Sequence, residues 1–119
     1  MKKKILVIDD DRINAKIVKL NLIKEGFHVE TAFDGDEGLS VVAEVNPDLI
    51  VLDVNMPNMN GYTFMLEIQK LEVQKETPVI VLTAQSDVRP IFKFNGVKDY
   101  LVKPISGPDL VEKVKKHVR

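Results

Sequence analysis

Residues 4–12 read KILVIDDDR, so four large apolar residues run directly into three acids. A run that is apolar at every position is typical of a strand covered on both faces, as in a parallel sheet. Carboxylates that crowd together repel one another, and partial burial raises the pKa of each. The stretch therefore predicts a buried strand whose acidic end needs a cation or a hydrogen-bond donor from elsewhere in the chain.

The same kind of apolar run recurs along the chain and alternates with longer amphipathic segments. We expect strands at residues 4–8, 27–32, 48–52, 78–82 and 97–102. We expect helices at about residues 12–25, 35–45, 61–73, 89–95 and 107–118. Gly26 suits the end of the first helix, and Pro108 suits the first turn of the last. With right-handed crossovers, this order predicts an α/β fold, a doubly wound five-stranded parallel sheet with helices on both faces.

Length and composition restrict the classes of protein that fit. With 119 residues and 45% hydrophobic content, we expect one compact domain over residues 1–119. The 17 basic and 18 acidic residues give a net charge of -1, which provides no bulk attraction for nucleic acid or anionic membranes. Without cysteine, the chain has no disulfide or thiolate site. It also lacks a signal peptide and an apolar run of about 18 residues, so we expect a cytoplasmic protein.

Polar residues end or follow four of the expected strands, namely Asp9 with Asp10, Asp53, Thr83 and Lys103. In doubly wound sheets the ligand site lies beyond the carboxyl ends of the strands. Asp11 lies near a helix start and is better explained as a cap. Two or three carboxylates beside backbone carbonyls form an oxygen site suited to Mg²⁺. Lys103 and Thr83 can bind phosphoryl oxygens, and Asp53 is placed to be a nucleophile that forms an acyl phosphate.

Four segments resemble the receiver domains of two-component response regulators, the CheY-like family, over the whole chain. They are ILVIDDD at 5–11, LIVLDVNMPNMNG at 49–61, PVIVLTA at 78–84 and KDYLVKP at 98–104. The resemblance implies a flavodoxin-like fold with strand order 2-1-3-4-5. It implies that Asp53 is the phosphoacceptor and contacts Mg²⁺, for which Mn²⁺ can substitute. The implied further ligands of the ion are Asp10 directly, Asp9 through water, and the carbonyl of Asn55.

The resemblance also implies roles for residues of the last two strands. Thr83 and Lys103 would bind the phosphoryl group. Tyr100 matches the switch aromatic of the family, whose ring moves inward when the threonine hydroxyl turns toward phosphate. A cis peptide is implied between Lys103 and Pro104. The two histidines, His28 and His117, have no neighbouring constellation and are expected to be structural, and Met56, Met59 and Met65 are expected to pack.

We therefore expect a switch that receives a phosphoryl group from a sensor histidine kinase or a phosphotransfer protein and acts on an unknown downstream effector. We expect it not to be a turnover enzyme, apart from self-phosphorylation and autodephosphorylation at Asp53, and not to bind nucleic acid or membranes directly. One alternative is a small Mg²⁺-dependent phosphatase with an aspartyl nucleophile, which commonly has a second acid two residues later, where this chain has Asn55. The other is a phosphorylation-independent docking module, which the complete set of site residues disfavours.

The first helix offers a candidate surface for the kinase. Ala15, Val18 and Leu22 form one apolar stripe, and a second stripe of Ile13, Ile17 and Leu20 lies nearly opposite. Since a single stripe can face the sheet, the other either packs on the last helix or stays partly open. The resemblance places kinase docking at this position, and we expect contributions from Asn14, Ile17, Pro104 and Ile105.

The segment between Thr83 and Lys103 is shorter than the family commonly has. Pro90 disfavours a helix that starts before Arg89, and Gly96 favours its end, which leaves under two turns. Phe92 and Phe94 point about 200° apart on a helix, so both cannot face inward. We expect this helix to be shortened, distorted or mobile, with one of the two rings exposed or the segment irregular.

Overall fold

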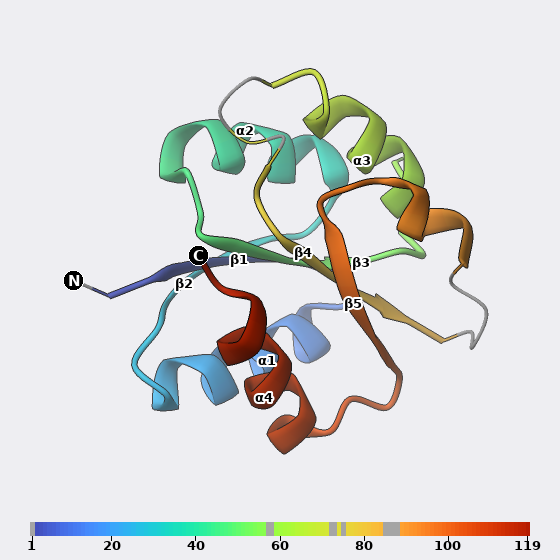
Figure 1. The fold of residues 1–119 in the computed structure, drawn as a ribbon. Coiled ribbons are helices and arrows are strands. Elements are labelled where there is room, and N and C mark those ends of the chain that lie inside the picture. Colours follow the sequence, from blue (N-terminus) through green and yellow to red (C-terminus); the bar gives the residue numbers. More distant parts are fainter. Residues whose placement is uncertain (1, 57–58, 72–73, 75, 85–88) are drawn as a thin grey trace.

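A computed structural model describes residues 1–119 except for residues 1, 57–58, 72–73, 75 and 85–88. Within the described part, five parallel strands form one sheet in the order β2-β1-β3-β4-β5 (Figure 1). The strands are β1 (Lys4–Ile8), β2 (His28–Ala32), β3 (Leu49–Asp53), β4 (Val79–Thr83) and β5 (Val97–Val102). The expected fold class and strand order are confirmed, with strand boundaries that differ by at most one residue.

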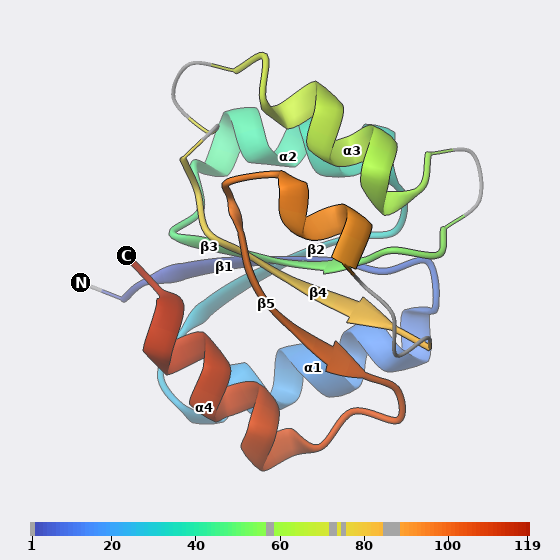
Figure 2. The ribbon, with the colours of Figure 1, turned by 45° about the vertical axis from the view of Figure 1, so that its right-hand side comes forward.

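Helices cover both faces of the sheet. The α-helices of the described residues are α1 (Arg12–Lys24), α2 (Gly35–Val45), α3 (Gly61–Ile68) and α4 (Gly107–His117), and a 3-10 helix, η1, spans Arg89–Lys93. Figures 1 and 2 show α1 and α4 on one face, with α2, α3 and η1 on the other. None of the helices in the described ranges is long and apolar enough to cross a membrane.

Each strand contributes side chains to two separate cores because successive residues of a strand point to opposite faces. In β1, Leu6 and Ile8 lie in the core beneath α2 and α3, whereas Ile5 and Val7 lie in the core beneath α1 and α4. All four side chains are fully buried. The continuous apolar run in this strand is therefore explained by helices on both faces, as the sequence predicted.

The helix boundaries near the site follow from local capping. Asp11 is the N-cap of α1, and its Oδ1 atom accepts hydrogen bonds from the backbone N–H groups of Ile13 at 3.0 Å and Asn14 at 3.1 Å. Gly26 follows α1 with a φ of 93°, a conformation that favours glycine. Pro108 lies in the first turn of α4. These positions confirm the capping predictions for α1 and α4.

Helix α3 is shorter than the sequence predicted, so the predicted end of this helix was wrong. The sequence predicted a helix over residues 61–73, but α3 ends at Ile68. After that residue, the N–H groups of Lys70 and Leu71 donate to carbonyl oxygens three residues earlier, at 3.2 and 3.0 Å. The backbone thus changes from α-helical bonding to tighter turns. Residues 72–73 lie outside the described part of the chain.

The segment before β5 is short and irregular, as predicted. Residues 89–93 form a 3-10 helix rather than an α-helix. Ile91 is fully buried and Phe94 is 8% exposed, so both side chains join the core beneath α2 and α3. Residues 85–88 and the side chain of Phe92 lie outside the described part of the structure. The turn continues through the N–H of Val97, which donates to the carbonyl of Phe94 at 3.0 Å.

Candidate functional site

Three carboxylates meet at the edge of the sheet formed by the carboxyl ends of its strands. Asp9 and Asp10 follow β1, and Asp53 is the last residue of β3. Strands β1 and β3 are neighbours, and Ile8 pairs with Leu52. Asp9 and Asp53 are the next residues of the two chain segments, so they lie at the same level of the sheet. One carboxylate oxygen from each of the three acids lies within 4.8 Å of the others. The predicted convergence of these acids is therefore observed.

The acids differ in their exposure to solvent. Asp9 is fully buried and Asp53 is 2% exposed, whereas Asp10 is exposed. Buried carboxylates that lie close together are unfavourable without a compensating charge. The Nζ atom of Lys103 provides one, because it lies 3.3 Å from Asp53 Oδ2 and 3.7 Å from Asp9 Oδ2. This is the cation that the opening stretch of sequence required.

Lys103 and Thr83 lie at the ends of two paired strands, at the same edge of the sheet as the acids. The backbone N–H of Lys103 donates to the carbonyl of Thr83 at 2.8 Å, which ties the residue after β5 to the end of β4. Thr83 is 3% exposed and follows Leu82, which pairs with Asp53. The peptide between Lys103 and Pro104 is cis, as expected.

Hydrogen bonds fix the two buried carboxylates. Asp53 Oδ1 accepts from the backbone N–H of Asn55 at 3.1 Å. Asp9 Oδ1 accepts from the backbone N–H of Asp11 at 3.0 Å, and Asp9 Oδ2 accepts from Nδ2 of Asn14 at 2.6 Å. The sequence interpretation connected Asn14 with partner docking and missed this contact. A polar residue in the first turn of the helix that follows the acidic strand end was the available signal.

Burial, followed by the charge of Asp9, raises the pKa of Asp53 to about 7, although Lys103 and the Asn55 N–H act to lower it. Ionised Asp53 is thus unfavourable in its surroundings even with the lysine present. A divalent cation would favour the ionised forms of all three acids. Clustered carboxylate oxygens are also the ligands that Mg²⁺ prefers. The acidic pocket is therefore compatible with Mg²⁺.

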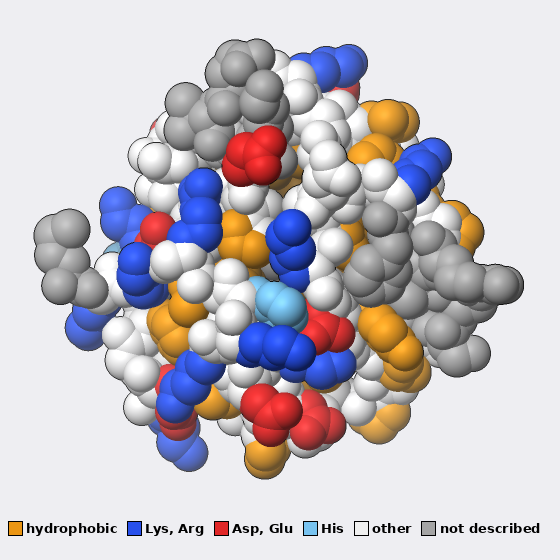
Figure 3. Space-filling model, in the orientation of Figure 1, with side chains coloured by type: hydrophobic (Ala, Val, Ile, Leu, Met, Phe, Trp, Pro, Cys, Tyr) orange, Lys and Arg blue, Asp and Glu red, His pale blue; other side chains and the backbone are white. Residues whose placement is uncertain are grey.

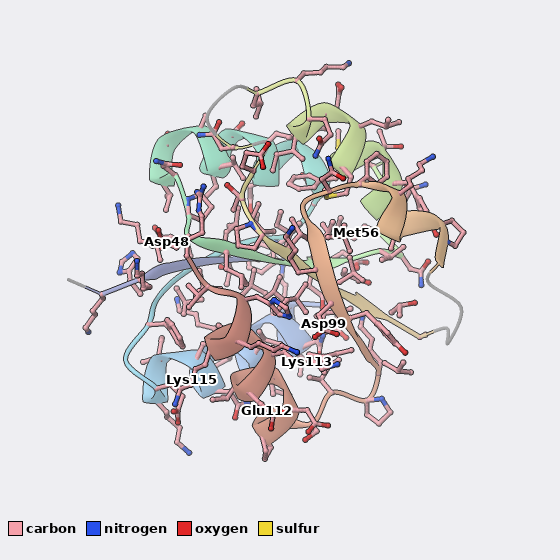
Figure 4. The ribbon with its side chains drawn as sticks, viewed as in Figure 1. Asp48, Met56, Asp99, Glu112, Lys113 and Lys115 are labelled. Atoms are coloured by element: carbon pink, nitrogen blue, oxygen red, sulfur yellow. The ribbon has the colours of Figure 1, made fainter. Side chains whose placement is uncertain are left out.

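The remaining residues singled out in the sequence analysis differ in their burial. Tyr100 is half-buried on β5, and the Nζ atom of Lys113 lies 5.3 Å from the centroid of its ring. Asn55 is exposed. Met56 and Met65 are buried in the core beneath α2 and α3, and Met59 packs against that core, which agrees with a packing role. Figure 4 labels Met56 among the side chains on that side of the sheet.

Each of the two histidines lies beside a carboxylate outside the acidic cluster. His28 is exposed on β2, with its Nε2 atom 4.0 Å from a carboxylate oxygen of Glu30. His117 lies in the last turn of α4, with its Nε2 atom 3.2 Å from Asp99 Oδ2. Neither histidine belongs to the group of carboxylates at the end of β1 and β3.

The expected docking residues lie near the same edge. Of the two apolar stripes on α1, Ala15, Val18 and Leu22 are buried, whereas the side chains of Ile13, Ile17 and Leu20 are 74%, 51% and 51% exposed. The second stripe therefore stays open. Pro104 is exposed and Ile105 is partly buried after β5.

The strand order and the acidic edge define a CheY-like, flavodoxin-like protein. The family model for the response regulator receiver domain matches residues 5–115, and the chain belongs to this family. Receiver domains of this family are switches in two-component signalling and are generally not enzymes.

Solved structures agree with this assignment. Chemotaxis protein CheY4 of Vibrio cholerae is 31% identical, with a TM-score of 0.92, and the match covers 99% of this chain and 100% of that chain. Response regulator TrrA of Thermotoga maritima, solved in complex with Mg²⁺-BeF, is 36% identical, with a TM-score of 0.85 and coverage of 98% and 99%. A CheY-like receiver domain protein of Methanospirillum hungatei is 30% identical, with a TM-score of 0.87 and coverage of 98% and 93%.

Proposed function

We propose that residues 1–119 act as one receiver domain that accepts a phosphoryl group on Asp53. The donor is the phosphohistidine of a sensor histidine kinase or of a phosphotransfer protein. The observation that carries the proposal is the position of Asp53, which is buried at the end of the central strand β3, close to two other acids and in an ion pair with Lys103. A nucleophilic carboxylate, a fixed cation and a cluster of oxygen ligands are the groups that phosphoryl transfer requires.

The metal in this proposal is Mg²⁺, for which Mn²⁺ can substitute. Its ligands are the carboxylates of Asp9, Asp10 and Asp53 together with the carbonyl of Asn55, with Asp9 bound through water. When bound, the ion neutralises the carboxylates and polarises a phosphoryl oxygen. The complex of the related TrrA with Mg²⁺-BeF supports this choice of metal.

The chain's own residues carry the transfer. A carboxylate oxygen of Asp53 attacks phosphorus in line, the bond between phosphorus and the donor imidazole nitrogen breaks, and the imidazole leaves with the electron pair of that bond. The ammonium group of Lys103, 3.3 Å from Asp53 Oδ2, binds a phosphoryl oxygen, and the Thr83 hydroxyl donates to another. Attack by water on the acyl phosphate later restores the carboxylate and releases phosphate. The chain resets itself in this way without turning over a separate substrate.

The switch in this proposal uses Thr83 and Tyr100. They lie on neighbouring strands, where Val81 pairs with Tyr100 and Thr83 pairs with Val102. In the phosphorylated protein the Thr83 hydroxyl turns toward the phosphoryl group, and the Tyr100 ring moves into the space that it leaves. This biases the surface of η1, β5 and α4 toward a second conformation, which a downstream effector reads.

The kinase docks on α1 and on the loop after β5 in this proposal. Ile17 is half-exposed on the outer face of α1, while Pro104 and Ile105 directly follow the site lysine. Asn14 lies in the first turn of the same helix. An exposed apolar stripe of this kind suits the apolar face of a partner helix.

One experiment distinguishes the proposed receiver function from the two alternatives, a Mg²⁺-dependent phosphatase and a phosphorylation-independent docking module. The protein is incubated with acetyl phosphate and Mg²⁺, and its intact mass is followed together with the release of phosphate. We expect wild type to gain the mass of one HPO₃ unit and to lose it after the donor is removed, and we expect Asp53→Asn to gain none. Continuous phosphate release from an added phosphomonoester would favour the phosphatase. Unmodified wild-type protein would favour the phosphorylation-independent docking module and contradict the proposal.

A further inference from the structure

Asn14 makes a contact that a docking role does not explain. Its Nδ2 atom lies 2.6 Å from Oδ2 of Asp9, the fully buried acid of the site. Hydrogen bonds from an amide to a carboxylate are charge-assisted and stronger than bonds between neutral groups. The contact therefore joins the first turn of α1 to the acidic end of β1.

Asn14 is itself held in place. Its backbone N–H donates to Oδ1 of Asp11 at 3.1 Å, so the N-cap of α1 fixes the main chain while the side chain reaches Asp9. The other oxygen of Asp9 accepts from the backbone N–H of Asp11 at 3.0 Å. Both oxygens of the Asp9 carboxylate are thus bound from the start of α1. Rotation of this carboxylate would break at least one of these bonds.

The contact also affects how Lys103 is shared. The Nζ atom of Lys103 lies closer to Asp53 Oδ2, at 3.3 Å, than to Asp9 Oδ2, at 3.7 Å. The Asn14 amide supplies a neutral donor to the same Asp9 oxygen, so this oxygen has a partner without drawing the lysine away from Asp53. Loss of the amide would leave a buried carboxylate oxygen to compete for Lys103.

We propose that Asn14 is a positioning residue of the metal site, which holds the Asp9 carboxylate toward Asp10 and Asp53 and so strengthens Mg²⁺ binding. The inference rests on the proposed function, because it assumes that these acids bind the ion. Groups that orient a metal ligand from outside the coordination sphere typically affect affinity by about 10- to 100-fold. The role of Asn14 would then be independent of any partner protein.

The test compares three variants with wild type. Asn14→Leu removes the amide at nearly constant size, and Asn14→Gln keeps an amide donor on a longer arm. Asn21→Leu is the matched control, since Asn21 lies on the same helix and its amide donates to the carbonyl of Ile17 at 2.9 Å, away from the acids. The Mg²⁺ dissociation constant is measured by NMR titration, and the melting temperature is measured in EDTA.

We expect Asn14→Leu to weaken Mg²⁺ binding about tenfold, Asn14→Gln to recover part of the affinity, and Asn21→Leu to leave it unchanged. A purely structural role would instead lower the melting temperature and leave the dissociation constant of the folded protein unchanged. Equal affinities of Asn14→Leu and wild type would overturn the inference alone. Wild-type protein that does not bind Mg²⁺ would overturn both the inference and the proposed function.

Phosphorylation by acetyl phosphate separates positioning from docking, because no kinase takes part. We expect Asn14→Leu to need more Mg²⁺ for half-maximal rate and to reach the wild-type rate at saturating Mg²⁺. If acetyl phosphate modifies the variant like wild type at every Mg²⁺ concentration and transfer from the kinase alone is slowed, Asn14 is a docking residue and the positioning role is wrong.

Discussion

Asp53 combines two properties that oppose each other in a folded protein. As the proposed nucleophile it must be ionised, but burial and the neighbouring Asp9 charge raise the pKa of this carboxyl from 3.8 to about 7. The native protein therefore binds more protons at Asp53 than the unfolded chain does between these two values. Stability falls as pH rises through this range, and the loss is complete above about pH 7.

We predict that Asp53→Asn stabilises the metal-free protein by roughly 1–3 kcal/mol at about pH 8, and by much less at about pH 5. The loss of the ion pair with Lys103 offsets part of the gain. The measurement is thermal or urea unfolding in EDTA. Added Mg²⁺ should stabilise wild type by mass action and so narrow the difference in the free energy of unfolding between wild type and Asp53→Asn.

Asp11→Asn is the matched control for this prediction, because it removes one nearby negative charge and keeps a good N-cap residue. Its effect on the free energy of unfolding should be small at both pH values. A wild-type protein that is more stable than Asp53→Asn at high pH without metal would contradict the electrostatic interpretation of the site.

Strand β5 and helix α4 are joined by a second group of charges, outside the proposed phosphorylation site. Lys113 Nζ lies 3.1 Å from Asp99 Oδ1 and donates to the carbonyl of Tyr100 at 2.7 Å, while His117 Nε2 lies 3.2 Å from Asp99 Oδ2. Figure 4 shows Asp99 of β5 beside Lys113 of α4. Figure 3 shows basic, acidic and histidine side chains mixed on this face. The group therefore ties α4 to the strand that carries the proposed switch aromatic.

Burial alone would raise the pKa of Asp99, but hydrogen bonds from the Tyr100 N–H, Lys113 and His117 hold it below the ordinary value of 3.8. A lowered pKa means that the carboxylate contributes stability above pH 3.8, and that this contribution is lost as pH falls through the folded-state value. We predict that Asp99→Asn costs about 1–2 kcal/mol near pH 7 and progressively less below the ordinary value.

Urea unfolding at a series of pH values measures this difference, with Glu112→Gln, an exposed neighbour on α4, as the control. The control should change the free energy of unfolding little at any pH. A cost of Asp99→Asn that grows toward low pH would have the wrong sign for a depressed carboxyl pKa.

Exposed apolar side chains are not spread evenly over the surface of the molecule. Among the described residues, most exposed large apolar side chains lie on α1, namely Ile13, Ile17, Leu20 and Ile23. The same helix carries Arg12, Lys16, Lys19 and Lys24 and no acidic residue. Its N-terminus begins directly after the acids of the site. A partner that binds this face would therefore lie beside Asp53.

We predict that Ile17→Glu slows phosphoryl transfer from the partner kinase about tenfold, because a charge replaces an apolar contact at the interface. Transfer is measured from purified phosphorylated kinase. The rate with acetyl phosphate should stay at the wild-type value, since that donor makes no use of α1.

Ile23→Glu provides the matched control, as Ile23 is 45% exposed on the same helix but lies near its far end. We expect its transfer rate to stay close to that of wild type. If Ile17→Glu also transfers as fast as wild type, the assignment of docking to α1 is wrong.

The sequence alone determined the sheet and the residues at its edge. The continuous apolar runs of β1 and β3 indicate strands covered on both faces, and parallel strands place their carboxyl ends together. The meeting of Asp9, Asp53 and Lys103 follows from these local patterns. The short segment before β5 was predictable for the same reason, because Pro90 and Gly96 act on the backbone beside them.

The tertiary structure alone decided the contacts between side chains of different elements. The bonds of Lys113 and His117 to Asp99 have no local signal in the sequence, and the place of Asn14 in the first turn of α1 does not by itself fix the bond of its amide to Asp9. Each depends on a distance between atoms that the fold brings together and on the rotamer that the packed surroundings allow. Periodicity predicts which face of a helix is buried, but the partner of a polar side chain is set by the elements packed around it.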